Sequence, residues 1–307
     1  MKKSMLKVFG LLLLGAGAVV SCDDDGLTKG DLSTLTANRF QAYVQTDDKD
    51  SLMWFIDNLD GTASVTYDPT NPLHRASESS TTIRVPYCWG ERFIPEVVTS
   101  VADGKEYSVT AIGQEAFMGC WKMKTVSIPE TVTSIGEGAF TMCSNLATVN
   151  IPSAVTQIPS ACFARCSSLR NTSMLHGDLT SIGKMAFYYC TKLASITIPE
   201  GVQSIGERAF FYCTNASLTS VRIPATVTKI GAYAFGHSYN GDASKPEETF
   251  SHIVDYYIDA SEPPVLEGPL FTTDSSPRAV PTVHVPASSV DAYKAAPYWQ
   301  DLNIVAE

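Results

Sequence analysis

The sequence is poor in charge, and most of its charge is acidic. Asp, Glu, Lys and Arg make up 18% of the 307 residues, and the formal net charge is −10. Proteins bind nucleic acids by neutralising phosphates with Lys and Arg, and they adhere electrostatically to anionic lipid with the same residues. We therefore expect neither a nucleic-acid partner nor electrostatic attraction to a membrane.

Catalytic motifs are also missing. The chain contains no G-x-S-x-G, no H-E-x-x-H and no P-loop, the patterns that position a nucleophile, a zinc ion or a phosphate. The carboxylates are scattered, and Glu115, Glu137 and Glu207 occupy related positions that we expect to face water. The sequence therefore offers no set of residues that could act as the catalytic groups of a hydrolase. We predict a protein that is not an enzyme and that has no cofactor and no metal site.

Long apolar runs are absent after the N-terminus. The first run, Val8 to Val20, follows three lysines and is shorter than the roughly 20 residues that a membrane-spanning helix needs. Residues 1–21 are therefore predicted to be a secretory signal peptide. No later segment is long and apolar enough to be a second membrane anchor.

The end of the leader, VVSC, resembles a bacterial lipobox, whose cysteine is lipidated. The resemblance implies that Cys22 carries a lipid, and the three aspartates after it resemble the acidic tag of surface-exposed lipoproteins of the Bacteroides group. Residues 22–50 would then be an acidic tether, and the protein would lie on the cell surface, attached to the outer membrane only by lipid. An ordinary signal peptide with an accidental cysteine is the alternative.

An internal repeat fills the middle of the chain. Phenylalanine recurs at intervals of 23 to 25 residues, at Phe117, Phe140, Phe163, Phe187, Phe210 and Phe235. The repeated pattern is VxIPxxVTxIGxxAFxxCxxLxx, in which V-x-I predicts a half-buried strand, Pro ends that strand, and the spacing from Ala to Leu predicts a short helical or 3-10 arc. A single coil of this kind cannot bury its apolar side, so we expect a solenoid of stacked coils.

Cysteine follows the phenylalanine by three residues in the first five repeats, at Cys120, Cys143, Cys166, Cys190 and Cys213. These positions favour a ladder of small buried thiols. Zinc sites need pairs two to four residues apart, which only Cys162 and Cys166 approach, and a nucleophile needs a base, which the five scattered histidines do not supply. Lipidation of Cys22 leaves seven of the eight cysteines, an odd number that argues against a complete disulfide framework. Whether any ladder cysteines pair stays open.

The pattern IPxxVTxIGxxAFxxCxxL resembles the BspA-like, or Treponema pallidum-type, leucine-rich repeat. The resemblance extends from Phe93 to about Tyr239, and the ending Val283 to Glu307 is similar to the ending of that family. It implies an α/β leucine-rich repeat solenoid with parallel coils of about 23 residues. Family members are typically secreted or cell-surface proteins, several of them associated with adhesion. Two insertions, after Leu169 and after Cys213, depart from the pattern.

Both ends of the repeat are predicted to be capped. Asp60-Gly61 and Asp103-Gly104 indicate two hairpins, which together would cap the first coil. The N-terminal β cap itself is assigned to residues 51–100. Residues 101–240 are assigned to the repeats, and residues 241–307 to terminal coils with a strand-plus-helix cap around SSVDAYKAA. Asp50-Ser51-Leu52 resembles a short O-glycosylation signal, and its occupancy is left open.

Binding residues are sought where the repeat varies, in the pair between Phe and Cys. Adjacent coils would place four aromatic residues together: Tyr188, Tyr189, Phe211 and Tyr212. If exposed, they form a recognition patch, and if packed between coils they only add stability. We expect a surface lipoprotein that binds proteins or mediates adhesion to host or microbial macromolecules. The alternative is an accessory glycan-binding lipoprotein that serves nutrient capture.

Overall fold

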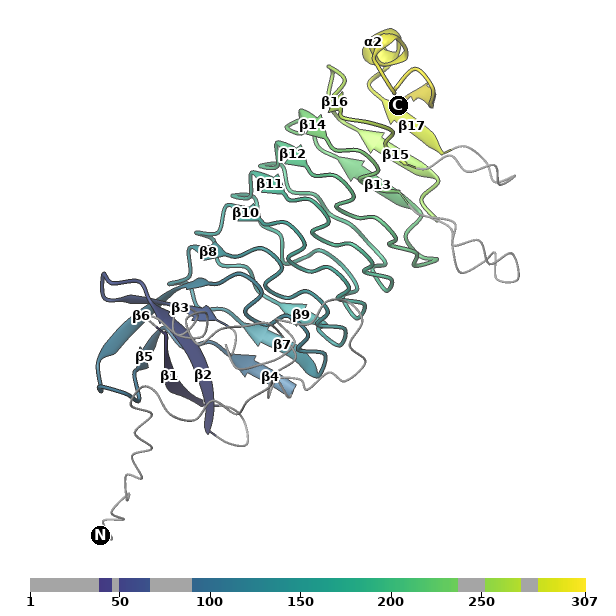
Figure 1. Ribbon diagram of the computed structural model, residues 1–307. Coiled ribbons are helices and arrows are strands. Elements are labelled where there is room, and N and C mark those ends of the chain that lie inside the picture. The colour runs from purple at the N-terminus through teal and green to yellow at the C-terminus, as the bar shows by residue number, and fades with distance from the viewer. Residues whose placement is uncertain (1–38, 46–49, 67–89, 237–251, 272–280) are drawn as a thin grey trace, which may run out of the picture. The chain divides into compact units, whose positions relative to one another are not determined.

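The computed structural model describes residues 39–45, 50–66, 90–236, 252–271 and 281–307 (Figure 1). Contacts divide the chain into two units, Met1–Ala37 and Asn38–Glu307, and everything described below belongs to the second. The predicted signal peptide, Cys22 and most of the predicted tether lie outside the described residues. Within the described part, no helix is long and apolar enough to cross a membrane.

A mixed sheet begins the described chain. Its strands are β1 (Arg39–Gln45), β2 (Asp50–Asp57), β3 (Thr62–Thr66), β5 (Val97–Thr99), β6 (Glu106–Ile112) and β8 (Ser134–Ile135). β2 and β3 form the hairpin expected at Gly61, and β5 and β6 form the hairpin expected at Gly104. β1 lies in the range predicted as tether, yet it pairs along its whole length with β2 and buries Phe40 and Ala42. The tether prediction is therefore wrong for residues 39–45.

Parallel coils follow, and their short strands form two ladders (Figure 1). The first ladder continues through β10 (Gln157–Ile158), β11 (Ser181–Ile182), β12 (Ser204–Ile205), β14 (Lys229–Ile230) and β16 (Val265–Leu266). The second ladder contains β4 (Gly90–Phe93), β7 (Met123–Ser127) and β9 (Thr148–Val149), and after a gap β13 (Ser220–Ile223), β15 (Asp255–Ile258), β17 (Thr282–Val285) and β18 (Asn303–Ala306). Equivalent residues pair in register, such as Ile182 with Ile205.

The first ladder is interrupted between β8 and β10, and Pro159 explains the gap. In neighbouring coils a glycine occupies this position, and its N–H donates to the carbonyl of the equivalent isoleucine in the preceding coil. Gly183 donates to Ile158 at 2.7 Å, and Gly206 donates to Ile182 at 2.8 Å. Proline has no N–H to donate, so the equivalent bond to Ile135 cannot form. One residue type thus separates two sheets.

The second ladder is interrupted between β9 and β13, where side chains replace backbone partners. The Asn150 amide accepts a hydrogen bond from the Ile128 N–H at 2.7 Å and donates one to the Ile128 carbonyl at 2.6 Å. The Thr172 hydroxyl does the same for Thr197, at 2.8 and 2.9 Å. Both residues lie in or beside coils that lack a regular strand, so they satisfy polar groups that a strand would otherwise pair.

The predicted helical arcs are turns instead. In each coil, bonds of the type N–H(i+3) to C=O(i) surround the phenylalanine, as from Cys143 to Phe140, but no helix forms in residues 110–236. The residues two before and two after each phenylalanine from Phe117 to Phe210 have positive φ, as Ala161 (54°) and Arg165 (60°) do. A left-handed residue ends a right-handed helix, which corrects the helical part of the predicted fold class.

These turns form a third ladder between coils, which we call the turn ladder. Alternate N–H groups bond to carbonyls of the following coil: Phe140 to Cys162, Met142 to Ala164, and Gly138 to Ser160, at 2.8 to 2.9 Å. Equivalent bonds join successive coils from Glu115 to Leu270. The turn ladder continues past Pro159 and Thr172, where both strand ladders stop.

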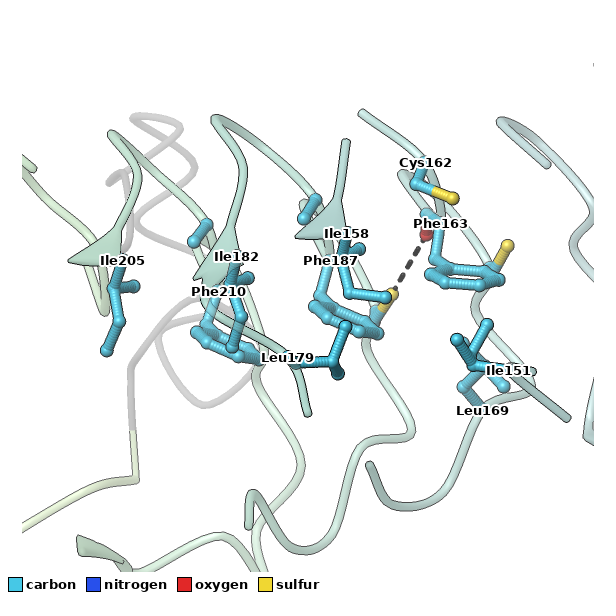
Figure 2. Close-up of a cluster of buried hydrophobic side chains, with 14 of the residues drawn as sticks. Ile151, Ile158, Cys162, Phe163, Leu169, Leu179, Ile182, Phe187, Ile205 and Phe210 are labelled. Atoms are coloured by element: carbon cyan, nitrogen blue, oxygen red, sulfur yellow. Dashed lines mark hydrogen bonds between the residues drawn. The ribbon is translucent and has the colours of Figure 1, made fainter. Parts of the chain in front are cut away.

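The core is a set of stacked columns (Figure 2). The six phenylalanines of the repeat lie at most 3% exposed, and neighbouring rings stack with centroids 5.1 to 5.4 Å apart. Beside them, the thiols of Cys143, Cys166, Cys190 and Cys213 donate to the carbonyl of the phenylalanine one coil earlier, as Cys190 does to Phe163 at 3.2 Å. The fold is therefore a stack of parallel coils with a continuous apolar interior.

The C-terminal end contains the 3-10 helix η3 (Ala287–Ser289) and helix α2 (Val290–Ala295) between β17 and β18. Tyr293 and Trp299 are fully buried, and their polar atoms donate to the carbonyls of Ala260 and Pro264, both at 2.8 Å. These bonds let two large side chains cover the last coils without an unpaired polar group.

Candidate functional site: a groove beside the turn ladder

The four aromatic residues singled out in the sequence do lie together. Tyr189 stacks on Tyr212 with ring centroids 4.0 Å apart, and Tyr188 stacks on Phe211 at 5.7 Å. Phe211 and Tyr212 are each only 8% exposed, so packing between coils accounts for them. Only Tyr188 and Tyr189, which are half-buried, present surface to a ligand.

A groove of about 530 Å³ runs across the first four coils, on the side of the turns where Tyr189 lies. Its lining comes from the residues around the variable pair and from the residue after each cysteine: Met118, Gly119, Trp121, Met142, Ser144, Arg165, Ser167, Tyr189 and Thr191. Of the predicted patch, only Tyr189 belongs to it. The sequence argument missed this groove because its main side chains come one at a time from separate coils.

Two large apolar side chains are exposed in the groove. Trp121 is 41% exposed and Met142 is 39% exposed. The Lys122 ammonium lies 4.8 Å from the centre of the Trp121 ring. Large apolar side chains left open on a concave surface are typical of interaction sites. The sequence carried two signals, the variable pair, to which Met142 belongs, and the departure of Trp121 from the Ser or Thr found at the equivalent positions 144, 167 and 191.

The charged group of the groove is Arg165. Its guanidinium lies 5.6 Å from the centre of the Tyr189 ring, and it forms no ion pair with any residue that the structure describes. Lys184 and Arg208, on the other side of the turn, both pair with Glu207. The hydrogen bond from Lys184 holds the pKa of Glu207 below its usual value. Arg165 is thus a cation whose carboxylate partner is not supplied by the described chain.

The ladder thiols are not reactive groups. Cys143, Cys162, Cys166, Cys190 and Cys213 are free and buried, while Cys120 is disulfide-bonded. Burial raises the pKa of the Cys213 thiol to about 12, and it raises those of Cys162, Cys166 and Cys190 well above their ordinary value. A thiol held neutral and away from water is neither a nucleophile nor a metal ligand. Among the described residues, no group of three His, Cys, Asp or Glu side chains could hold a metal ion.

A second polar cluster lies on the C-terminal sheet. Tyr257 lies between Arg222, at 5.2 Å, and the His284 ring, at 4.5 Å. Arg222 pairs with Asp259 and Glu307, and His284 pairs with Asp255 at 2.8 Å. Because these side chains pair with one another across the last coils, the cluster joins those coils and leaves none of these groups free for a ligand.

Comparisons with known proteins agree with the repeat. Residues 110–242 match, in six copies, the family described as BspA type leucine rich repeat region. A leucine-rich cell-surface protein of Faecalibacterium prausnitzii is 23% identical, with a TM-score of 0.42, over 81% of this chain and 71% of its own. A leucine-rich repeat protein of Bacteroides ovatus is 20% identical, with a TM-score of 0.40, over 82% and 70%.

The leucine-rich repeat protein of T. pallidum is 19% identical, with a TM-score of 0.36, over 87% of this chain and 95% of its own. A comparison with curated protein sequences gives no match.

Proposed function

We propose that this chain, whose residues 110–242 are BspA-type leucine-rich repeats, is a non-enzymatic binding protein held on the outer surface of the cell by a lipid on Cys22. Its repeats bind a protein partner and thereby mediate adhesion. The observation that carries the proposal is the groove, where Trp121 and Met142 stay exposed although the rest of each coil buries its large apolar residues.

The test is a binding experiment with the lipid-free chain, in which Cys22 is replaced by Ser. Matrix proteins, bacterial surface proteins and polysaccharides are passed separately over the immobilised chain. Saturable binding of at least one protein supports the proposal. If none of the proteins binds, the proposed function is wrong.

Glycan capture in nutrient uptake is the second candidate. It is favoured by the hydroxyl groups of Ser144, Ser167 and Thr191, which line the groove and can accept hydrogen bonds from sugar hydroxyls. In the same experiment, binding of polysaccharides alone would support this second function and contradict the first.

A further inference from the structure

We infer that the groove binds an extended acidic segment of a partner protein, which seats a large apolar side chain between Trp121 and Met142 and pairs a carboxylate with Arg165. This inference rests on the proposed function and adds to it the site and the chemistry of the ligand. It has three supports, which are the apolar lining, the charge and the length of the groove.

The apolar lining suits an amino-acid side chain better than a sugar. Trp121 and Met142 come from adjacent coils, and Met118 lines the same end of the groove. Methionine is flexible and polarisable, so it adapts to apolar side chains of different shape, and tryptophan is frequent among residues that dominate protein interfaces. The N-terminal end of the groove is therefore built to accept a leucine, methionine or aromatic side chain.

The aromatic faces argue against a sugar platform. Tyr189 stacks on Tyr212 of the following coil, and Arg165 of the preceding coil lies over its ring. Both faces of Tyr189 are thus covered by the chain itself. Since Lys122 lies over Trp121, at most one open aromatic face is left for a sugar ring to stack on.

The charge around the groove favours an anion. The stretches that form this side of five coils are MGCWK, TMCSN, ARCSS, YYCTK and FYCTN, starting at residues 118, 141, 164, 188 and 211. They contain three cations, Lys122, Arg165 and Lys192, and no Asp or Glu, although the chain as a whole has 32 acidic and 22 basic residues. Complementary charge selects partners and speeds their encounter, so the segment bound here carries carboxylates.

The spacing of the coils sets the length of the segment. Centroids of the phenylalanine rings in the first four coils are 5.3, 5.4 and 5.4 Å apart, so the groove extends about 16 Å, which about five residues of extended chain would span. Trp121 and Arg165 lie two coils apart. The apolar residue and the acidic residue of the ligand are therefore expected about three positions apart, since an extended chain rises about 3.3 Å per residue.

The experiment is selection of short random peptides, displayed on phage, against the full lipid-free chain. The selected peptides are then made with a fluorescent label and titrated by polarisation at low and high salt. The expected peptides contain a large apolar residue and, about three positions away, Asp or Glu. Their binding weakens at high salt because the pair with Arg165 is near the surface.

Variants with matched controls locate the site. Arg165→Glu is compared with Arg170→Glu, which makes the same charge change on an exposed residue of the same coil outside the groove. Trp121→Ala is compared with Tyr298→Ala, since Tyr298 is 43% exposed in the C-terminal cap. We expect the groove variants to weaken binding at least tenfold and the controls to leave it unchanged.

Arg165→Gly guards against a folding artefact. Arg165 has a φ of 60°, a conformation that glycine adopts freely, so this variant removes the side chain without a loss of melting temperature. If peptides without acidic residues are selected, or if a partner protein binds the groove variants and the native chain equally well, the inference is wrong while the proposed function stands. If no protein partner binds at all, the proposed function itself has failed.

Discussion

The glycines that follow Ile135, Ile182, Ile205 and Ile230 are fixed by the backbone of the preceding coil. A Cβ atom on Gly206 would lie 2.5 Å from the Lys184 nitrogen, so the coils would have to move apart. Gly206→Ala should lower the free energy of unfolding by about 1–3 kcal/mol, the usual cost of overpacking, as measured by urea denaturation.

Gly177→Ala is the matched control for this prediction. Nothing lies within 4 Å of the Cβ position of Gly177, and its φ is not positive. The control should be neutral or slightly stabilising, because alanine restricts the unfolded chain. Equal losses in the two variants would contradict the role assigned to close coil stacking.

Buried thiols make the stability of the repeat sensitive to alkaline pH. The pKa of Cys213 is raised to about 12 in the folded chain, against 9.0 for an ordinary thiol. The unfolded chain therefore loses thiol protons above about pH 9, while the folded chain keeps them, and the free energy of unfolding falls as pH rises between these two values.

The measurement is urea denaturation at about pH 8 and about pH 10. Cys213→Ala, which removes this thiol, should show a smaller loss between the two pH values than the native chain. An identical loss would show that the buried thiol does not contribute. In the native state the ladder thiols should also resist alkylation by iodoacetamide, since the reactive species is the thiolate.

At the scale of elements, Pro159 decides where the first ladder stops. Pro159→Gly restores the N–H that, in other coils, donates to the isoleucine of the preceding coil. The new amide should therefore bond to the Ile135 carbonyl. Hydrogen exchange should then show residue 159 as protected as Gly183, whose N–H bonds to Ile158 at 2.7 Å.

Pro159→Ala serves as the comparison, because it restores the N–H but keeps a Cβ atom at a position where neighbouring coils have none. We expect weaker protection in this variant. An amide at position 159 of the glycine variant that exchanges as fast as an exposed loop would contradict the explanation of the gap.

The inward positions of the repeat were predictable because their period is regular. The phenylalanines, the cysteines, the isoleucines and both N-terminal hairpins lie where the pattern placed them. The turns were mistaken for helical arcs because a spacing of three residues fits both. Positions 165 and 189 have positive φ but are occupied by Arg and Tyr, so no glycine in the sequence indicated the left-handed conformation. Strand β1 was missed because its polar surroundings resemble a tether.

The candidate site was predictable only in part. Tyr188 and Tyr189 were found from the variable pair, but burial of Phe211 and Tyr212 depends on packing between coils. The exposed Asn150 side chain depends on packing too, because it bonds to both backbone groups of Ile128 in the preceding coil. Trp121 and Met142 form one surface only once the coils are stacked in register, which no single stretch of sequence shows.

At the scale of the whole molecule, anchoring by Cys22 is the prediction that decides where the groove acts. Cells supplied with labelled palmitate should incorporate label into the native chain but not into Cys22→Ala, and protease added to intact cells should digest the native protein. A native chain that is exported without label would contradict the lipid anchor.

The turn ladder also gives the stack of coils a net dipole along its axis. In the coils of Phe117 to Phe210, three N–H groups point toward the next coil. They belong to the phenylalanine and to the residues two before and two after it, such as Gly138, Phe140 and Met142. Each peptide unit has a dipole of about 3.5 D, and here the dipoles add in parallel, with the positive end toward the C-terminal coils. The wall that borders the groove therefore resembles a helix macrodipole with its sense along the chain reversed, so a ligand with charge at one end should lie in the groove in a single orientation.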